Sequence, residues 1–215
     1  KFFNNWNFIF MKFDKKTLDM KKAQGGWKSF SSEFLLTPVL SMEAFFTREE
    51  LDKVIDKNLQ VLHRMFLKLD KGDKHVVAGV DIGKKRNPSH ISVFIDDADG
   101  NLVQIFQQFW DQVEYIEQAN RINTICENFQ VDKLYYDNTR SEMEERGLAR
   151  PCVPIKFTGR GERNQASYAT DFGARVEKKT IKLIDDDRFI SQILCVSNDL
   201  KAVSGPMGHA DSFWS

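Results

Sequence analysis

The spacing of hydrophobic and polar positions changes along the chain, and from Val76 onward it favours β-strands. Short apolar runs rich in β-branched residues are separated there by turn residues, which is typical of strands. The predicted strands cover residues 76–83, 90–96, 102–110, 131–137 and 152–157, with a turn at 97–100. Because short turns join the first three, they are expected to form an antiparallel meander.

Helical spacing of apolar residues appears between and after these strands. The predicted helices cover residues 113–129, 141–148 and 164–179, a last helix begins at His209, and residues 189–196 form either a helix or a strand. A helix that leads from a meander into a further strand indicates a parallel crossover. The pattern therefore predicts an α/β domain whose mixed sheet of about five strands is flanked by helices.

Residues 1–72 show a different pattern, rich in aromatic residues and lysine. Thr47 and Glu50 have the spacing of a capping box, which predicts a helix over residues 46–69. The preceding residues 29–46 carry hydrophobic anchors without a clear period, as an extended arm would. A short, charged, glycine-containing stretch at 68–74 is the predicted boundary, so residues 1–72 form a helical N-terminal arm and residues 73–215 the α/β domain.

Composition limits the possible classes of protein without naming one. Lys and Arg together number 31, as do Asp and Glu, so net charge points neither to nucleic acid nor to a membrane. The cysteines form no CxxC pair and are expected to be reduced thiols of a cytosolic protein. The sequence has no stretch of about 20 uninterrupted apolar residues and no signal peptide, which predicts a soluble protein. Because the sequence begins with Lys1 rather than Met, we expect it to be a fragment of a longer protein.

Acidic residues at strand ends are the candidate chemistry. Asp81 lies near the end of the apolar run VVAGVDIG, and Asp137 ends a second apolar strand in LYYDNT. If those strands are neighbours, the two carboxylates meet, and Asp211 in GHADSFW reaches the same place from the last helix. Grouped carboxylates repel unless divalent cations lie between them, and oxygen ligands select Mg²⁺ or Mn²⁺. Two such cations about 3.5–4 Å apart hydrolyse phosphodiesters without a side-chain nucleophile.

Each candidate also has a purely structural explanation. Asp81 could form a turn, and Asp137 could form an Asx turn or cap a helix. Asp211 could be an acid in the first turn of a helix, where the helix dipole stabilises it. His209 is more often a helix N-terminal residue, or one that supports the neighbouring acid, than a direct ligand. The acidic run at 185–187 lies between apolar segments and is predicted to be a solvated turn.

Basic residues near the acids are candidates for binding phosphate groups. One group follows Asp81 in a loop, one residue follows Asp137, and the rest lie in the glycine-containing segment TGRGERN. These residues are Lys84, Lys85, Arg86, Arg140, Arg160 and Arg163. An ordinary solvated surface is the alternative for all of them.

The order of these motifs resembles the ribonuclease H-like nuclease domain of phage terminase large subunits. VAGVDIG lies on the first strand, LYYDNT on the fourth, and GHADSFW opens the last helix. The upstream stretch FSSEFLLTPVLSMEAFFTREEL looks like the segment that joins a packaging ATPase to its nuclease in that family. Together, these parts extend the resemblance over most of the chain.

The resemblance implies a metal-dependent endonuclease that cuts concatemeric double-stranded viral DNA during genome packaging in the host cytoplasm. It implies that Asp81, Asp137 and Asp211 hold two divalent cations, Mg²⁺ or Mn²⁺, and that His209 lies beside the last acid. Residues 73–215 would then be the nuclease domain. The implied partners are double-stranded DNA, the terminase ATPase domain, the small terminase subunit and the portal, with no membrane. Because the chain has no Walker A motif, ATPase activity is not expected of it.

Two other classes of protein stay open. Actin-like and sugar-kinase-type ATPases also begin with a DxG strand, but they need a second phosphate-binding lobe for which the residues after Val76 are too few. A non-catalytic docking module of a packaging motor would use residues 1–72 to bind a partner, and its acids would be structural. Within the nucleases, a preference for four-way junctions or RNA–DNA hybrids would indicate a resolvase or a ribonuclease H.

Overall fold

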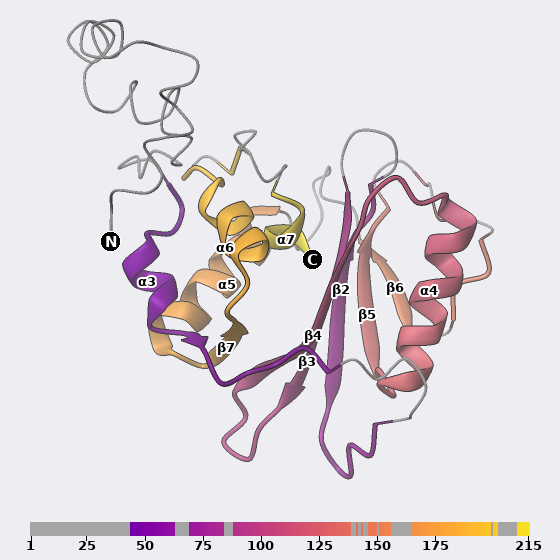
Figure 1. Cartoon of the computed structure of the whole chain (residues 1–215), viewed down its shortest axis with the longest axis horizontal. Helices are drawn as coiled ribbons and strands as arrows, with labels where there is room; N and C mark the ends of the chain where they lie inside the picture. The colour runs from indigo at the N-terminus through magenta and orange to yellow at the C-terminus, as the bar shows by residue number, and fades with distance from the viewer. Residues whose placement is uncertain are drawn as a thin grey trace, which may run out of the picture. The chain divides into compact units, whose positions relative to one another are not determined.

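A seven-stranded mixed sheet is the framework of the computed structural model (Figure 1). The strands lie in the order β1-β7-β4-β3-β2-β5-β6. They are β1 (Ile55–Asp56), β2 (Val76–Asp81), β3 (Ser89–Asp96), β4 (Leu102–Trp110), β5 (Lys133–Asp137), β6 (Cys152–Ile155) and β7 (Ile181–Ile184). The predicted meander is formed by β2, β3 and β4, and the other strands add to it by parallel pairing.

The structure describes residues 44–62, 69–83, 88–138, 141, 143, 146–149, 151–155, 165–198, 200–201 and 210–215. Phe45–Ser215 form one unit and Lys1–Ala44 another. Phe45, Phe46, Leu51 and Val54 pack with the last helices of the chain, so this part of the predicted arm belongs to the larger unit. The functional boundary near residue 72 stays a prediction.

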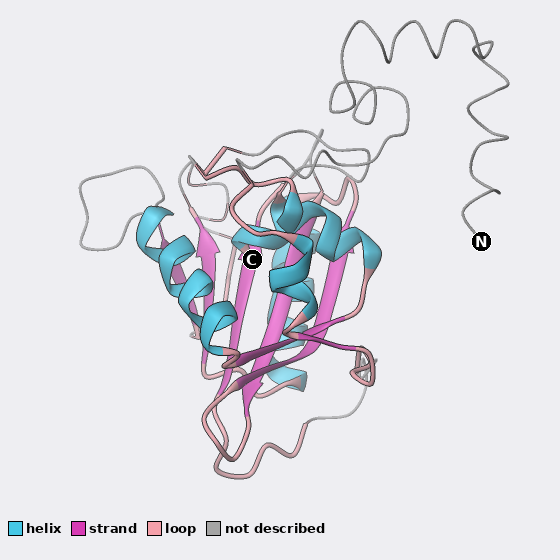
Figure 2. Ribbon diagram, turned by 90° about the vertical axis from the view of Figure 1, so that its left-hand side faces the viewer, coloured by secondary structure: helices cyan, strands magenta, loops and turns pink. Residues whose placement is uncertain are grey.

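Helices cover both faces of the sheet (Figures 1 and 2). They are α3 (Arg48–Asp52), α4 (Tyr115–Asn128), α5 (Gln165–Lys178), α6 (Asp187–Leu194) and α7 (Asp211–Trp214). Helix α4 lies on one face, and α5, α6 and α7 lie on the other. The prediction of a mixed sheet flanked by helices is confirmed. No helix in the described part of the chain is long and apolar enough to cross a membrane.

Along β2, fully buried residues alternate with partly buried ones, so the two faces of the sheet carry different residues. Val76, Ala78 and Val80 are buried in the core beneath α4. Because successive side chains of a strand point to opposite faces, Gly79 and Asp81 point to the side of α5, α6 and α7. Asp81, the first candidate acid, therefore points to the same face as the helices at the C-terminal end of the chain.

The predicted helix at 46–69 is much shorter in the structure. Its N-terminus is confirmed: Thr47 Oγ1 accepts a hydrogen bond from the Glu50 amide at 3.2 Å, and Glu50 accepts one from the Thr47 amide at 2.8 Å. The helix ends at Asp52 because Ile55 and Asp56 pair in parallel with β7 instead. Pairing with a distant strand overrides the helical spacing, and residues 63–68 lie outside the described part.

Strand β7 is not among the predicted strands, and together with β1 it raises the count to seven. It has four residues, IKLI, which are too few to show a clear alternation. The ambiguous segment after it is helix α6, and Asp186 caps this helix by accepting a hydrogen bond from the Phe189 amide at 2.8 Å. The acidic run at 185–187 therefore starts a helix. Of the predicted helix 141–148, the described residues 141, 143 and 146–148 are not helical.

We expect Gln104→Leu to lower the free energy of unfolding by about 1–3 kcal/mol. Gln104 is fully buried, its Oε1 accepts a hydrogen bond from the Ile184 amide of β7 at 2.9 Å, and its Nε2 donates to Ser92 Oγ at 3.2 Å. The substitution leaves that buried amide without its acceptor. Urea denaturation measures the change. Gln108→Leu, at an exposed position of the same strand, is the control and should change stability little; equal effects would contradict the prediction.

Candidate metal site at the strand ends

Asp81 and Asp137 lie side by side at one edge of the sheet. β2 and β5 are parallel neighbours, and Val80 pairs with Tyr136, so the next residue on each strand is the candidate acid. Neighbouring strands are about 4.8 Å apart. Because Val80 and Tyr136 are buried beneath α4, the two acids point to the opposite face. The strands are therefore neighbours, as the carboxylate hypothesis requires.

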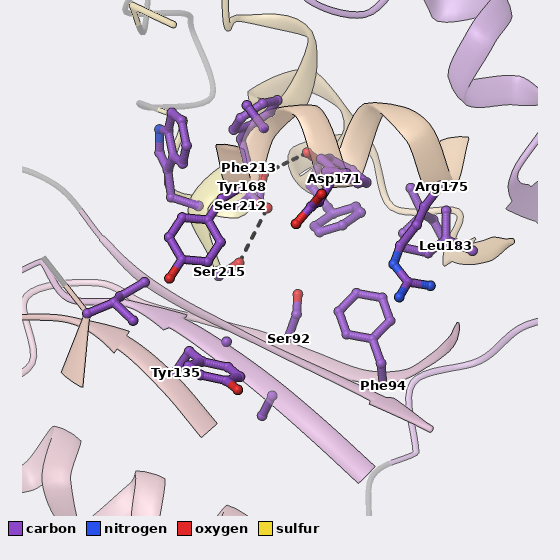
Figure 3. Close-up of a pocket in the computed structure, with 18 residues that line it drawn as sticks. Ser92, Phe94, Tyr135, Tyr168, Asp171, Arg175, Leu183, Ser212, Phe213 and Ser215 are labelled. Carbon is purple, nitrogen blue, oxygen red and sulfur yellow. Dashed lines mark hydrogen bonds between the residues drawn. The ribbon is translucent and has the colours of Figure 1, made fainter. Parts of the chain in front are cut away.

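Asp211 is the first residue of α7, which packs over this same face. Its side chain is buried, and the helix contacts β2, β3 and α6. The next residue, Ser212, attaches the helix to α6: its amide donates to Gln192 Oε1 at 3.0 Å, and its hydroxyl donates to the Phe189 carbonyl at 2.9 Å (Figure 3). The third predicted acid thus comes from a helix that is anchored on α6 and packs against the strand that carries Asp81.

Gly79 permits the close approach of α7 to β2. A Cβ atom at this position would lie 2.4 Å from the carbonyl carbon of Ser215 and 3.2 Å from its carbonyl oxygen. Gly79 precedes Asp81 by two residues and points to the same face. The absence of a side chain here therefore sets how near the helix that carries Asp211 comes to the strand that carries Asp81.

His90 is a buried residue of the site that sequence reasoning missed. It pairs with Asp81 across the antiparallel strands β2 and β3 and is fully buried. Its Nε2 lies 2.9 Å from Gln107 Oε1, and its Nδ1 is hydrogen-bonded to the Ser215 hydroxyl. Burial lowers the pKa of His90 to about 3, so the ring is neutral at physiological pH. In the neutral ring only one nitrogen carries a proton; with the Gln107 oxygen as acceptor, that nitrogen is Nε2 and Nδ1 is the acceptor for the Ser215 hydroxyl, which also lies 3.3 Å from the Ser212 carbonyl oxygen.

Arg188 places a positive charge near Asp211. This arginine of α6 forms a two-pronged ion pair with Asp111 at 2.7 and 3.1 Å, and its guanidinium lies 4.1 Å from the centre of the Phe109 ring. Asp111 is the largest cause of the raised pKa of Arg188, and the charges of Asp211 and Asp186 also contribute. The guanidinium therefore stays charged and partly compensates the buried carboxylate of Asp211.

A buried polar network fixes both ends of the loop that follows Asp81. The Gly83 amide donates to Ser89 Oγ at 2.9 Å, and Gln118 Nε2 donates to the Gly83 carbonyl at 2.7 Å. Ser89 and Gln118, which are both fully buried, bond to each other at 2.8 Å. The loop thus leaves and re-enters the sheet at fixed points. No local sequence pattern indicates this network.

The remaining predicted site residues lie outside the described part of the chain. They are His209, Lys84, Lys85, Arg86, Arg140, Arg160 and Arg163. Their predicted roles stay predictions.

A cavity of about 250 Å³ lies on the same face of the sheet, and its lining includes Gly79, Tyr135 and Ser212, which are one or two residues from the candidate acids in the sequence. Its floor includes Ser92, Phe94 and Tyr135, and its roof includes Arg175 of α5 and Ser212 of α7 (Figure 3). In Figure 3 the Arg175 side chain extends from α5 toward Phe94. The face that carries the acids is therefore only partly filled by side chains.

The donor set fits a hard divalent cation, although the three acids do not form a closed cluster. Asp81 and Asp137 supply carboxylate oxygens at adjacent strand ends, and Mg²⁺ and Mn²⁺ prefer oxygen ligands. Among the described residues, no three His, Cys, Asp or Glu side chains are grouped closely enough to hold a metal ion. The strand pairing brings Asp81 and Asp137 together, and a shift of at least one of the three acids is needed for all of them to share a cation.

Comparison with solved structures identifies the fold. No protein-family model and no curated protein matches the sequence significantly. The large terminase nuclease of thermophilic phage G20c superimposes with a TM-score of 0.61 at 16% identity, over 81% of this chain and 95% of that one. The P22 large terminase nuclease domain gives a TM-score of 0.52 at 10% identity, over 76% and 85% of the two chains. This chain has the fold of a phage large-terminase nuclease domain.

Further solved structures share this terminase nuclease fold. The large terminase of phage HK97 matches over 94% of this chain and 49% of its own length, with a TM-score of 0.56 and 12% identity. The G20c nuclease has been solved with bound magnesium, cobalt and zinc. The resemblance predicted from the order of motifs is confirmed at the level of the ribonuclease H-like fold.

We expect Gly79→Ala to lower the free energy of unfolding by about 1–3 kcal/mol, because the added methyl group overpacks the contact with α7. Thermal and urea denaturation measure the loss. Gly173→Ala in α5 is the matched control, since a Cβ there would lie 3.6 Å from the Phe45 ring, an ordinary contact. It should leave stability unchanged or raise it through helix propensity. Unchanged stability of Gly79→Ala would contradict the close packing.

The neutral state of His90 predicts how stability depends on pH. The unfolded chain binds a proton at His90 below pH 6.5, whereas the folded chain does so only near pH 3. Stability due to this group is therefore lost as pH falls through that window, by up to about 1.4 kcal/mol per pH unit. Denaturation of the wild type and His90→Asn between pH 7 and 4 tests this, because the difference in slope isolates the histidine. Parallel curves would contradict a neutral buried ring.

Proposed function

We propose that this chain is a metal-dependent endonuclease that cleaves double-stranded viral DNA during genome packaging. The main support is the pair of carboxylates, Asp81 and Asp137, at adjacent strand ends, together with the packing of the helix that begins with Asp211 against β2. The same fold occurs in the large-terminase nucleases of phages G20c and P22. The G20c nuclease binds magnesium, which supports a divalent cation here as well.

The three acids have distinct proposed roles. Asp81 would contact both of two Mg²⁺ or Mn²⁺ ions, and Asp137 and Asp211 would each complete the coordination of one. When bound, the ions would supply an activated water and stabilise the leaving oxygen of the phosphodiester. The protein would orient the carboxylates: the parallel strands set the positions of Asp81 and Asp137, and α7 would bring Asp211 toward them. His209 would support Asp211 from the residues just before α7.

The basic residues would hold the DNA by its phosphates. Lys84, Lys85 and Arg86 follow Asp81 in a loop whose two ends are fixed by the network of Ser89 and Gln118. Arg140, Arg160 and Arg163 would extend the same contact. Binding through phosphates predicts little base specificity and a steep loss of affinity with salt.

The proposed context is a viral packaging complex in the host cytoplasm. Residues 73–215 would be the nuclease domain, and residues 1–72 the arm that joins a packaging ATPase. The match to about half of the HK97 large terminase supports a partner domain of this kind. The small terminase subunit and the portal would be further partners.

Digestion of plasmid DNA tests this function. We expect cutting in Mn²⁺ or Mg²⁺, none in EDTA, and none by Asp81→Ala, because loss of the shared ligand removes both cations. Asp185→Ala is the matched control, since Asp185 is exposed at the start of α6 and should be dispensable. Equal cutting in EDTA, or by Asp81→Ala, would contradict the proposal. ATP hydrolysis with adenosine recognition would favour the ATPase alternative instead.

A further inference from the structure

The position of helix α7 depends on its contacts with neighbouring elements. It begins at Asp211, and its N-cap Ala210 makes no side-chain capping hydrogen bond. Without a cap, the first turn has little stability of its own, because helix nucleation costs more than the first few hydrogen bonds return. The place of Asp211, its first residue, therefore depends on the contacts that α7 makes with the rest of the fold.

Those contacts attach α7 at two ends. Near its start, Ser212 bonds to Gln192 and to the Phe189 carbonyl of α6. Just after its end, the hydroxyl of Ser215 bonds to His90 Nδ1 on β3. The first attachment leads to a neighbouring helix, whereas the second leads to the sheet that carries the other two acids. The second is a side-chain hydrogen bond to the residue paired with Asp81, and it adds to the backbone contact of Ser215 with Gly79.

His90 is held rigidly enough to act as such an attachment. Its ring centre lies 4.2 Å from that of Phe109 and 5.6 Å from that of Phe189. Gln107 bonds to its other nitrogen at 2.9 Å. Both ring nitrogens are thus engaged, one as donor and one as acceptor, which requires a neutral imidazole.

We propose that His90 is a positioning residue for metal binding, which holds the end of α7 through Ser215 and thereby sets the distance of Asp211 from Asp81 and Asp137. Because His90 pairs directly with Asp81, its Cα lies within about 4.5–5.5 Å of that of the acid. A shift of α7 on this attachment therefore changes the distance of Asp211 from the two acids on the sheet. The inference rests on the proposed function, since it assigns His90 to the same metal site.

Two substitutions separate the two hydrogen bonds of the ring. In His90→Asn, the side-chain oxygen takes the place of Nδ1 and can still accept from Ser215, but the bond to Gln107 is lost. In His90→Gln, the longer amide takes the place of Nε2 and keeps Gln107, but the bond to Ser215 is lost. Each variant loses one buried bond, so both should lower the melting temperature by similar amounts.

Metal affinity should distinguish the variants. We expect His90→Gln to raise the dissociation constant for Mn²⁺ about 10- to 100-fold, as substitutions of residues that orient metal ligands do. His90→Asn should stay close to the wild type. Ser215→Ala should also raise the dissociation constant, and adding His90→Gln to it should change the constant no further, because both substitutions remove the bond between His90 and Ser215. Calorimetric titration of Mn²⁺ into the folded chain measures this without relying on DNA cleavage.

The possible results separate the inference from the proposed function. If the wild type binds Mn²⁺ in an Asp81-dependent manner but His90→Gln binds it equally well, the positioning role is overturned and the nuclease proposal survives. If both His90 variants lose affinity equally, His90 acts only through stability and the positioning role is again overturned. If the wild type shows no Asp81-dependent binding of Mn²⁺, both proposals are overturned.

Discussion

The contact between Gly79 of β2 and the end of α7 is the constraint on which the candidate site depends. Two of the acids are fixed by the sheet, because adjacent parallel strands in register place Asp81 and Asp137 together. The third comes from α7, and the residue that follows this helix, Ser215, lies almost on the backbone of β2. Only a residue without a side chain at position 79 allows that approach.

Electrostatics constrains the same region in a second way. Neighbouring carboxylates repel, and burial adds a desolvation penalty for Asp211. Arg188, which is held by its ion pair with Asp111, places a positive charge that partly stabilises the carboxylate of Asp211. His90 stays neutral and adds no charge of its own. A divalent cation would relieve the remaining repulsion, so metal binding and the packing of α7 are expected to be coupled.

Sequence patterns predict the parts of this arrangement that are local. The meander, α4 and the acids at strand ends follow from periodicity and from an Asp at the end of an apolar run. The strand β7 and the early end of α3 depend on pairing between distant residues, so local spacing misjudged both. His90 and Arg188 escaped notice for a related reason: their roles arise from strand register and helix packing, which a single sequence does not display.

The central claim is that Asp81, Asp137 and Asp211 together hold divalent cations at one edge of the sheet. A crystal structure of the chain with Mn²⁺, using the anomalous scattering of the metal, tests it most directly. The account predicts anomalous density between Asp81 and Asp137, with α7 drawn in so that Asp211 completes the coordination. Manganese bound elsewhere, with no density between the two strand-end acids, would contradict it.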